Sequence, residues 1–194
     1  MPLMVEYIFD VASGQTWTDA GLTPSITASL ITTDGAPNNS GACIKFTSGT
    51  SGLTNVVERC RGPLLTWEDM GVPAGKIVTE CYCPSFYYKK ATLAGVTLTQ
   101  VDHRIVTSSN VNALSSSMCT TGLGTTASGW VQSTNASERP LVLAANQASN
   151  TQVRLEFGLK LSTSSGVTAD VRFDLLKIYI SYAPPGRGNT LPFV

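Results

Sequence analysis

The only histidine in the chain, His103, limits the nucleophilic chemistry that its residues could perform. Ser-His-Asp and Cys-His mechanisms need a base that takes the proton from the nucleophile. His103 stands between two candidate strands in the sequence Asp102-His103-Arg104, a setting typical of a surface turn. The chain also lacks the Gly-x-Ser-x-Gly motif that presents a nucleophilic serine on a sharp turn. We therefore expect no nucleophilic catalysis.

Carboxylates offer a second route to chemistry, because glycoside hydrolysis needs two of them at one cleft. The sequence brings no such pair together from its candidates, which are Glu58, Glu68, Asp69, Glu80, Glu156 and Asp174. The adjacent Glu68 and Asp69 follow Trp67 in a turn, where carboxylates commonly accept hydrogen bonds from backbone N–H groups. The sequence predicts a protein that is not an enzyme and has no catalytic residues.

Calcium is the one cofactor that the sequence leaves open. β-sandwich domains can hold a loop with calcium bound to carboxylate and carbonyl oxygens. Asp10 and Asp174 are the candidate ligands, with Asp34 as a third, although no D-x-D-x-D-G loop is present. The alternative for each is an isolated, solvated or ion-paired aspartate. We expect no other cofactor.

Aromatic residues are the candidates for binding a sugar ring. They are Trp17, Trp67, Trp130, Tyr82, Tyr87 and Tyr88. Such side chains could stack on carbohydrate, or they could belong to the core or to an interface, as aromatic residues in a sandwich often do. Carbohydrate is thus a possible partner.

The five cysteines are an odd number and lack CxxC spacing, so they fit neither a disulfide framework nor a zinc site. We expect most to be reduced and buried. Cys81 and Cys83 flank one residue of a predicted strand, so both side chains lie on the same face and can fill core volume.

Charge and hydropathy exclude several partners. Lys plus Arg and Asp plus Glu number 13 each, so no excess of positive charge predicts binding to nucleic acid or to an anionic membrane. No segment has the length of a membrane span, and residues 1–10 do not resemble a signal peptide, so we expect synthesis in the cytoplasm. Only 13% of residues are charged, which favours a surface partly covered in a homo-oligomer.

The composition also predicts one all-β domain over residues 1–182, because Thr, Val, Gly and Ser are abundant and strong helix formers are scarce. Residues 42–47 and 54–60 read as a hairpin with a Gly-bearing turn. Further strands are expected at residues 5–11, 26–33, 76–88, 95–104, 129–134 and 140–144, and residues 110–128 read as a long loop with one short strand.

The clearest alternation occurs in residues 151–161, where apolar residues occupy every second position. Residues 169–182 alternate too, but their apolar phase changes once. An inserted residue has this effect, so we expect a β-bulge near residues 174–176. The turn at residues 162–168 predicts that these two strands pair with each other in antiparallel fashion.

A Pro- and Gly-rich arm is expected at residues 183–194. Its prolines and glycines disfavour a regular strand, yet it ends in apolar residues. The arm is either a disordered end or a segment that docks on a neighbouring subunit. The candidate interface residues are Pro184, Pro185, Leu191, Phe193 and Val194.

Two segments carry a family resemblance: residues 67–75, with the sequence W-E-D-M-G-V-P-A-G, and residues 169–182, with A-D-V-R-F-D-L-L-K-I-Y-I-S-Y. They resemble jelly-roll virion proteins of tailed bacteriophages, a group of capsid decoration, head-fibre and tail-associated domains that look like carbohydrate-binding modules. The likeness covers roughly residues 5–182.

This resemblance implies an antiparallel jelly-roll β-sandwich of about eight strands with no catalytic residues. It also implies self-association, with a trimer favoured, and location in the virion. The protein would be a capsid decoration (cement) or head-fibre protein that binds the major capsid protein or other virion proteins. The alternative is a carbohydrate-binding or receptor-binding tail-associated module.

Overall fold

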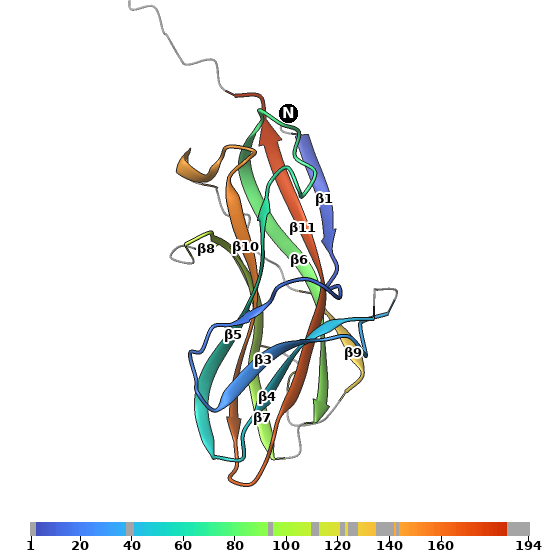
Figure 1. Ribbon diagram of the computed structural model, residues 1–194, viewed down its shortest axis with the longest axis vertical. Helices are drawn as coiled ribbons and strands as arrows, with labels where there is room; N and C mark the ends of the chain where they lie inside the picture. Colours follow the sequence, from blue (N-terminus) through green and yellow to red (C-terminus); the bar gives the residue numbers. More distant parts are fainter. Residues whose placement is uncertain are drawn as a thin grey trace, which may run out of the picture.

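The computed structural model describes residues 3–37, 41–92, 95–109, 113–120, 123, 128–134, 142 and 144–185. In this part of the chain, two antiparallel sheets face each other across one apolar core. The protein is therefore an all-β sandwich, as the composition predicts. Figure 1 shows an elongated sandwich in which the central strands β10 and β11 run along its length.

The six-stranded sheet has the order β3 (Ile26–Ile31), β4 (Cys43–Ser48), β11 (Asp170–Ala183), β6 (Ile77–Thr92), β9 (Trp130–Thr134), with β1 (Leu3–Phe9) also paired to β11. The five-stranded sheet has the order β2 (Thr18–Asp19), β5 (Leu53–Thr66), β10 (Gln152–Thr163), β7 (Val96–Thr107), β8 (Ala113–Cys119). The described residues thus form eleven strands, more than about eight, because short segments such as β2 and β9 extend the sheets.

The predicted pairing of the last two strands is wrong. β10 pairs with β5 and β7, whereas β11 pairs with β4, β6 and β1 in the other sheet. Phe157 of β10 stacks on Phe173 of β11 across the core, with ring centroids 5.4 Å apart. Each strand carries one apolar face, and opposing these faces buries both. The turn between the strands therefore crosses from one sheet to the other.

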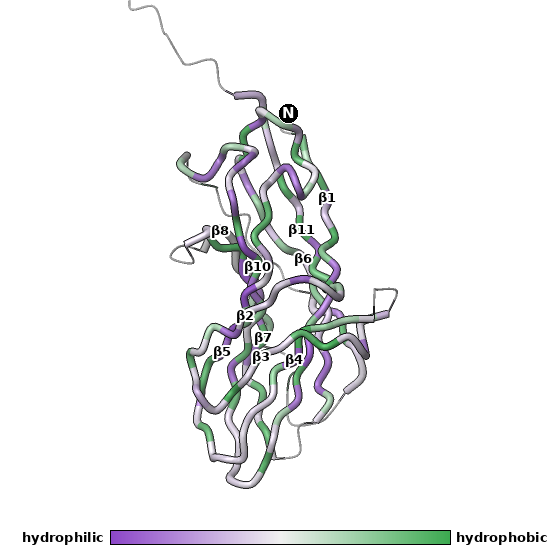
Figure 2. Tube along the Cα trace, viewed as in Figure 1, coloured by the Kyte–Doolittle hydropathy of each residue, from purple (hydrophilic) through white to green (hydrophobic). Residues whose placement is uncertain are grey.

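The predicted hairpin of residues 42–47 and 54–60 is wrong for a similar reason. Both strands exist, but β4 pairs with β3 and β11, while β5 pairs with β2 and β10. A Gly- and Ser-rich connection has the same composition in a hairpin and in an arch between two sheets. Figure 2 shows why the strands themselves were recognisable: hydrophobic and hydrophilic positions alternate along them.

The β-bulge in the last strand is confirmed. Asp174 pairs with Tyr87 and Lys177 with Ser85, so the register shifts between them. Leu175 within the bulge has φ of 42°, a left-handed conformation that is uncommon for a residue with a side chain. The bulge lets Phe173 and Leu176 both point into the core although they are three positions apart.

Two local predictions are confirmed as well. The five cysteines are free and buried, and Cys81 and Cys83 belong to the core. In the turn after β5, the Asp69 carboxylate accepts a hydrogen bond of 2.7 Å from the Thr66 backbone N–H. The prediction of a carboxylate that caps this turn holds.

The last described strand ends close to the start of the expected arm, and the boundary between domain and arm stays a prediction. β11 runs to Ala183, and Pro184 and Pro185 follow it on the surface. Leu191, Phe193 and Val194 lie outside the described residues, so the docking of the arm stays a prediction. In the described part of the chain, no helix is long and apolar enough to cross a membrane.

Candidate binding groove

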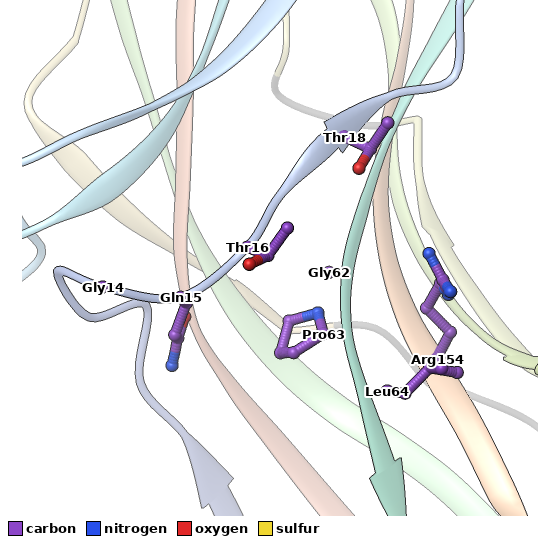
Figure 3. Close-up of a pocket in the computed structure, with 8 residues that line it drawn as sticks. All are labelled: Gly14, Gln15, Thr16, Thr18, Gly62, Pro63, Leu64 and Arg154. Atoms are coloured by element: carbon purple, nitrogen blue, oxygen red, sulfur yellow. The ribbon is translucent and has the colours of Figure 1, made fainter.

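A groove of about 440 Å³ lies at the edge of the five-stranded sheet. Its lining comes from the connection between β1 and β2, from β5 and from β10, and consists of Gly14, Gln15, Thr16, Thr18, Gly62, Pro63, Leu64 and Arg154. Figure 3 shows the segment of residues 14–18 on one side of β5 and Arg154 on the other. The volume falls in the range of known small-molecule sites.

Trp17 holds the segment of residues 14–18 in place. Its ring stacks on Phe157 at a centroid distance of 5.6 Å and meets Phe9 edge-on at 5.9 Å. Its indole N–H donates to the Gln15 side-chain oxygen at 3.0 Å. Because side chains alternate along an extended segment, this anchoring leaves Thr16 and Thr18 exposed toward the groove.

Gly62 makes room for Trp17. A Cβ atom at this position would lie 2.9 Å from the Trp17 ring and 3.1 Å from the Leu155 carbonyl oxygen. Real Cβ atoms do not approach other atoms so closely, so a side chain here would displace the indole. The glycine therefore sets the shape of the groove wall.

Pro63 is tolerated because β5 has an open edge at this point. Strand β2 pairs only with Arg61 and Cys60, and the register with β10 shifts between Arg154 and Glu156. Proline has no N–H to donate, and it occurs in sheets at edges and bulges of this kind. Beyond it, Leu64 is 42% exposed and adds an apolar contact surface.

The groove offers hydrogen-bonding groups without an acid–base pair. Its polar groups are the Thr16 and Thr18 hydroxyls, the Gln15 amide and the Arg154 guanidinium. The Gln15 amide is fixed, since it also donates to the Asp10 carbonyl oxygen at 2.9 Å. None of the described residues that line the groove is a carboxylate or a histidine, so this lining can bind a ligand but does not offer the pair of groups that glycoside hydrolysis needs.

The nearby outer face of the sheet carries paired charges. Glu156, only 1% exposed, accepts from Arg61 at 3.2 Å and from Arg104 at 2.5 Å. Two positions further along β10 is Gly158, and the ion pair of Arg59 and Asp102 crosses over it. A side chain at Gly158 would collide with both of these residues. Each of these two carboxylates is therefore engaged by arginine.

The prediction of a surface turn for His103 is wrong. The residue lies in the middle of β7, is fully buried and packs edge-on against Phe86 at 5.4 Å. Neither ring nitrogen has a hydrogen-bond partner in the described structure. Burial lowers the pKa of His103 to about 3, so the ring is neutral at pH 7. His103 is a core residue without access to a substrate.

The other predicted aromatic residues lie away from the groove. Trp67 is fully buried and its indole N–H donates to the Asn146 carbonyl oxygen at 2.9 Å. Tyr82 faces Tyr179 on the outer face of the six-stranded sheet, with ring centroids 5.1 Å apart. Tyr88 is buried, while Tyr87 and Trp130 are half-buried on β6 and β9.

Asp174 serves as an acceptor for backbone N–H groups from three segments. Its carboxylate oxygens accept from Val11 at 3.2 Å, from Ala36 at 2.8 Å and from Leu175 at 2.7 Å. Its side chain is buried, and this desolvation raises the pKa of Asp174 to about 6. The carboxylate thereby ties the bulge to the β1–β2 and β3–β4 connections.

The calcium prediction for Asp10 and Asp174 remains a prediction. Nothing tests it directly, and the described residues contain no group of three or more His, Cys, Asp or Glu side chains arranged to hold a metal ion. Asp34, the third candidate, forms ion pairs with Lys89 and Arg172. These cations help to hold the pKa of Asp34 below its usual value, against the opposing effect of its burial.

Sequence reasoning missed the groove itself. None of its lining residues was predicted to bind a ligand, although the neighbouring Trp17 was a candidate for binding a sugar ring. The signal that could have found it is the Gly62-Pro63 pair inside a predicted strand, because such a pair marks a bulge or an open edge.

Comparisons with known proteins support the fold. No model of a protein family matches the chain, and no curated protein sequence matches it. Among solved structures, an arabinose-bound MgGH51 α-L-arabinofuranosidase matches 91% of the chain with 11% identity and a TM-score of 0.54. The chain spans only 26% of that enzyme, so the likeness concerns a single domain of its size.

Two carbohydrate-binding modules also match with lower scores. The first is CBM27-1 of Caldicellulosiruptor saccharolyticus in complex with mannohexaose, at 10% identity over 88% of this chain and 95% of the module, with a TM-score of 0.47. The second is a CBM22 xylan-binding domain, at 13% identity over 93% and 97%, with a TM-score of 0.42. None of the solved structures named here is a virion protein.

Proposed function

We propose that the protein is a non-catalytic carbohydrate-binding domain and that the groove between residues 14–18 and β5 holds the glycan. The observation that carries the proposal is the composition of this groove. Hydroxyl, amide and guanidinium groups surround it, while Pro63 and Leu64 supply an apolar contact. A sugar presents the same mixture, since its ring carries hydroxyl groups and apolar C–H patches.

The groove also has the rigidity that a binding site needs. Pro63, Leu64 and Arg154 belong to two paired strands, and Trp17 fixes the remaining wall by packing on Phe157. Hydrogen-bonding groups that are held in place before the ligand arrives lose less conformational entropy on binding. The proposal extends to this chain the kind of ligand named for the arabinose-bound enzyme, and the groove supplies the argument for it.

The same lining supports the proposal that the domain is non-catalytic. Hydrolysis of a bound glycan would need two carboxyl groups about 5 to 10 Å apart across the scissile bond. Glu156, two positions from Arg154 on β10, is almost fully buried and is held by Arg61 and Arg104. A bound glycan would therefore leave the groove unchanged.

A glycan array tests the proposal. We expect the full chain to bind a subset of oligosaccharides, and the double variant Thr16→Ala, Thr18→Ala to bind them about thirtyfold more weakly, because two hydrogen bonds of about 1 kcal/mol each are lost. Thr97→Ala is the matched control, since Thr97 is an exposed threonine on β7 of the same sheet. Absence of binding at millimolar glycan, or equal loss in the control, would refute the proposal.

A second candidate is the self-associating virion protein that the sequence resembles. One observation favours self-association: β1 exposes Leu3, Met4 and Ile8, each more than half accessible to solvent. These apolar side chains lie on a strand that pairs only with β11 among the described strands, so its other edge is open to a second copy. Light scattering of the purified chain tests this, and a monomer at high concentration would argue against it.

A further inference from the structure

The distribution of charge around the groove indicates which class of glycan would bind there, an inference that rests on the proposed function. Outward-facing positions of a strand are those between its core residues, and on β10 these are Arg154, Glu156, Gly158 and Lys160. Residues paired with them on β5 and β7 point to the same side of the sheet. The cross-strand register therefore defines the outer face of the sheet row by row.

This outer face carries more positive than negative charge. Its cationic side chains are Arg59, Arg61, Arg104, Arg154 and Lys160, and its carboxylates are Asp102 and Glu156. Five cations against two anions leave a local surplus of three positive charges, although the whole chain is neutral. The even charge balance of the sequence thus conceals an uneven distribution in the fold.

The two carboxylates are already engaged by other arginines. Glu156 uses one oxygen for Arg61 and the other for Arg104. Asp102 accepts from both guanidinium nitrogens of Arg59 and, at 2.6 Å, from the Gln100 amide. Neither carboxylate is left to neutralise a further cation.

Among the arginines that the structure describes, Arg154 has no carboxylate partner. Its neighbours across the strands are the apolar residues Leu64 and Val106. Its Nε atom is buried and has no hydrogen-bond partner within the described residues, and its side chain lines the groove. Arg59, Arg61, Arg104 and Arg172, by contrast, all have a carboxylate partner.

We propose that Arg154 binds the carboxylate of an acidic sugar, so that the groove prefers uronic-acid glycans to neutral ones. A guanidinium presents a planar fork of N–H donors that matches the two oxygens of a carboxylate. The Thr16 and Thr18 hydroxyls across β5 are free to bind the hydroxyl groups of the same sugar. The positive surplus on the adjoining rows attracts further acidic residues of a polymer.

Calorimetry with two matched ligands tests this inference. The ligands are an oligogalacturonate and the same oligomer with its carboxyl groups methyl-esterified, which keeps the hydroxyls and removes the charge. We expect the acid to bind at least about tenfold more tightly than the ester, as hydrogen bonds to charged groups are worth more than neutral ones.

The protein variants are Arg154→Gln and, as the control, Lys160→Gln. Each removes one positive charge from the same face, but Lys160 lies six positions along β10, about 20 Å from Arg154. Arg154→Gln should lower the affinity for the acid at least about tenfold and that for the ester by much less, so that the preference for the acid disappears, and Lys160→Gln should change the affinity for either ligand less than twofold. Circular dichroism verifies that both variants fold.

The possible failures are distinct. If no glycan binds, charged or neutral, the proposed function itself fails. If the ester and neutral glycans bind as tightly as the acid, the groove binds carbohydrate but the inference about Arg154 is overturned. If an oligothymidylate of equal charge binds as tightly as the oligogalacturonate, the face attracts any polyanion, and the preference for an acidic sugar is refuted.

Discussion

Replacing the buried histidine of β7 with leucine should remove most of the acid sensitivity that this residue confers on the fold. His103 is neutral and fully buried, and both of its ring nitrogens lack partners. His103→Leu substitutes an apolar side chain of similar size. At pH 7.5 we expect the free energy of unfolding to be equal to or higher than that of the wild type, because two unpaired polar atoms leave the core.

The magnitude at lower pH follows from proton linkage. The pKa of His103 falls from 6.5 in the unfolded chain to about 3 in the folded one. Between these values the unfolded state binds a proton that the folded state does not, so the free energy of unfolding decreases as the pH falls. From pH 7.5 to 4.5 the loss amounts to about 3 kcal/mol, because the slope approaches 1.36 kcal/mol per pH unit once the pH is below the pKa of the unfolded state.

Urea denaturation at pH 7.5, 6.0 and 4.5 measures this effect as a difference between the two proteins. Other groups titrate in the same range, but they are common to wild type and variant and cancel in the comparison. The advantage of His103→Leu over the wild type should therefore grow by about 3 kcal/mol between pH 7.5 and 4.5. A constant difference across this range would show that His103 takes up its proton as readily in the folded state as in the unfolded one, and the assignment of a neutral core histidine would be wrong.

Three further changes have defined outcomes. The pKa of Asp174 rises from 3.8 to about 6 on folding, so between these values the folded state binds more protons and the free energy of unfolding increases as the pH falls. In urea denaturation, this increase should be up to about 3 kcal/mol from pH 7 to pH 4, and Asp174→Asn should remove it. Gly62→Ala should displace the indole of Trp17, change the tryptophan fluorescence and weaken glycan binding, whereas Gly129→Ala, where nothing lies within 4 Å, should do neither. The five buried cysteines should react with a thiol reagent only after unfolding, since burial raises the pKa of Cys43 and Cys60 to about 12; rapid reaction of the native protein would contradict their placement.

The strands could be predicted from the sequence because alternation records which side chains are buried. It identified β10 and the bulge in β11, where the apolar phase changes at Leu175. Pairing could not be predicted in the same way. Alternation shows that a strand has a core face but not which strand lies beside it, so two strands that oppose each other across the core look the same as a hairpin.

His103 and the groove illustrate two different obstacles. His103 lies near the end of the predicted strand at residues 95–104 and shares its phase with the buried residues Val101 and Ile105, so following the alternation of that strand to its end would have placed it in the core. The groove depends on a contact between Trp17 and Gly62, which are far apart in the chain. The unpaired state of Arg154 likewise depends on which arginines reach Glu156 and Asp102, a matter of register that no sequence pattern records.

The most direct test of the account is an NMR titration of the isotope-labelled chain with oligogalacturonate. If the groove is the binding site, the amide signals that shift should cluster at residues 14–18 and 62–64 and at Arg154. The Arg154 side-chain Nε–H, buried without a partner, should shift with them. Shifts confined to the tyrosines of the other sheet, Tyr82 and Tyr179, or an unchanged spectrum at millimolar glycan, would contradict the central claim.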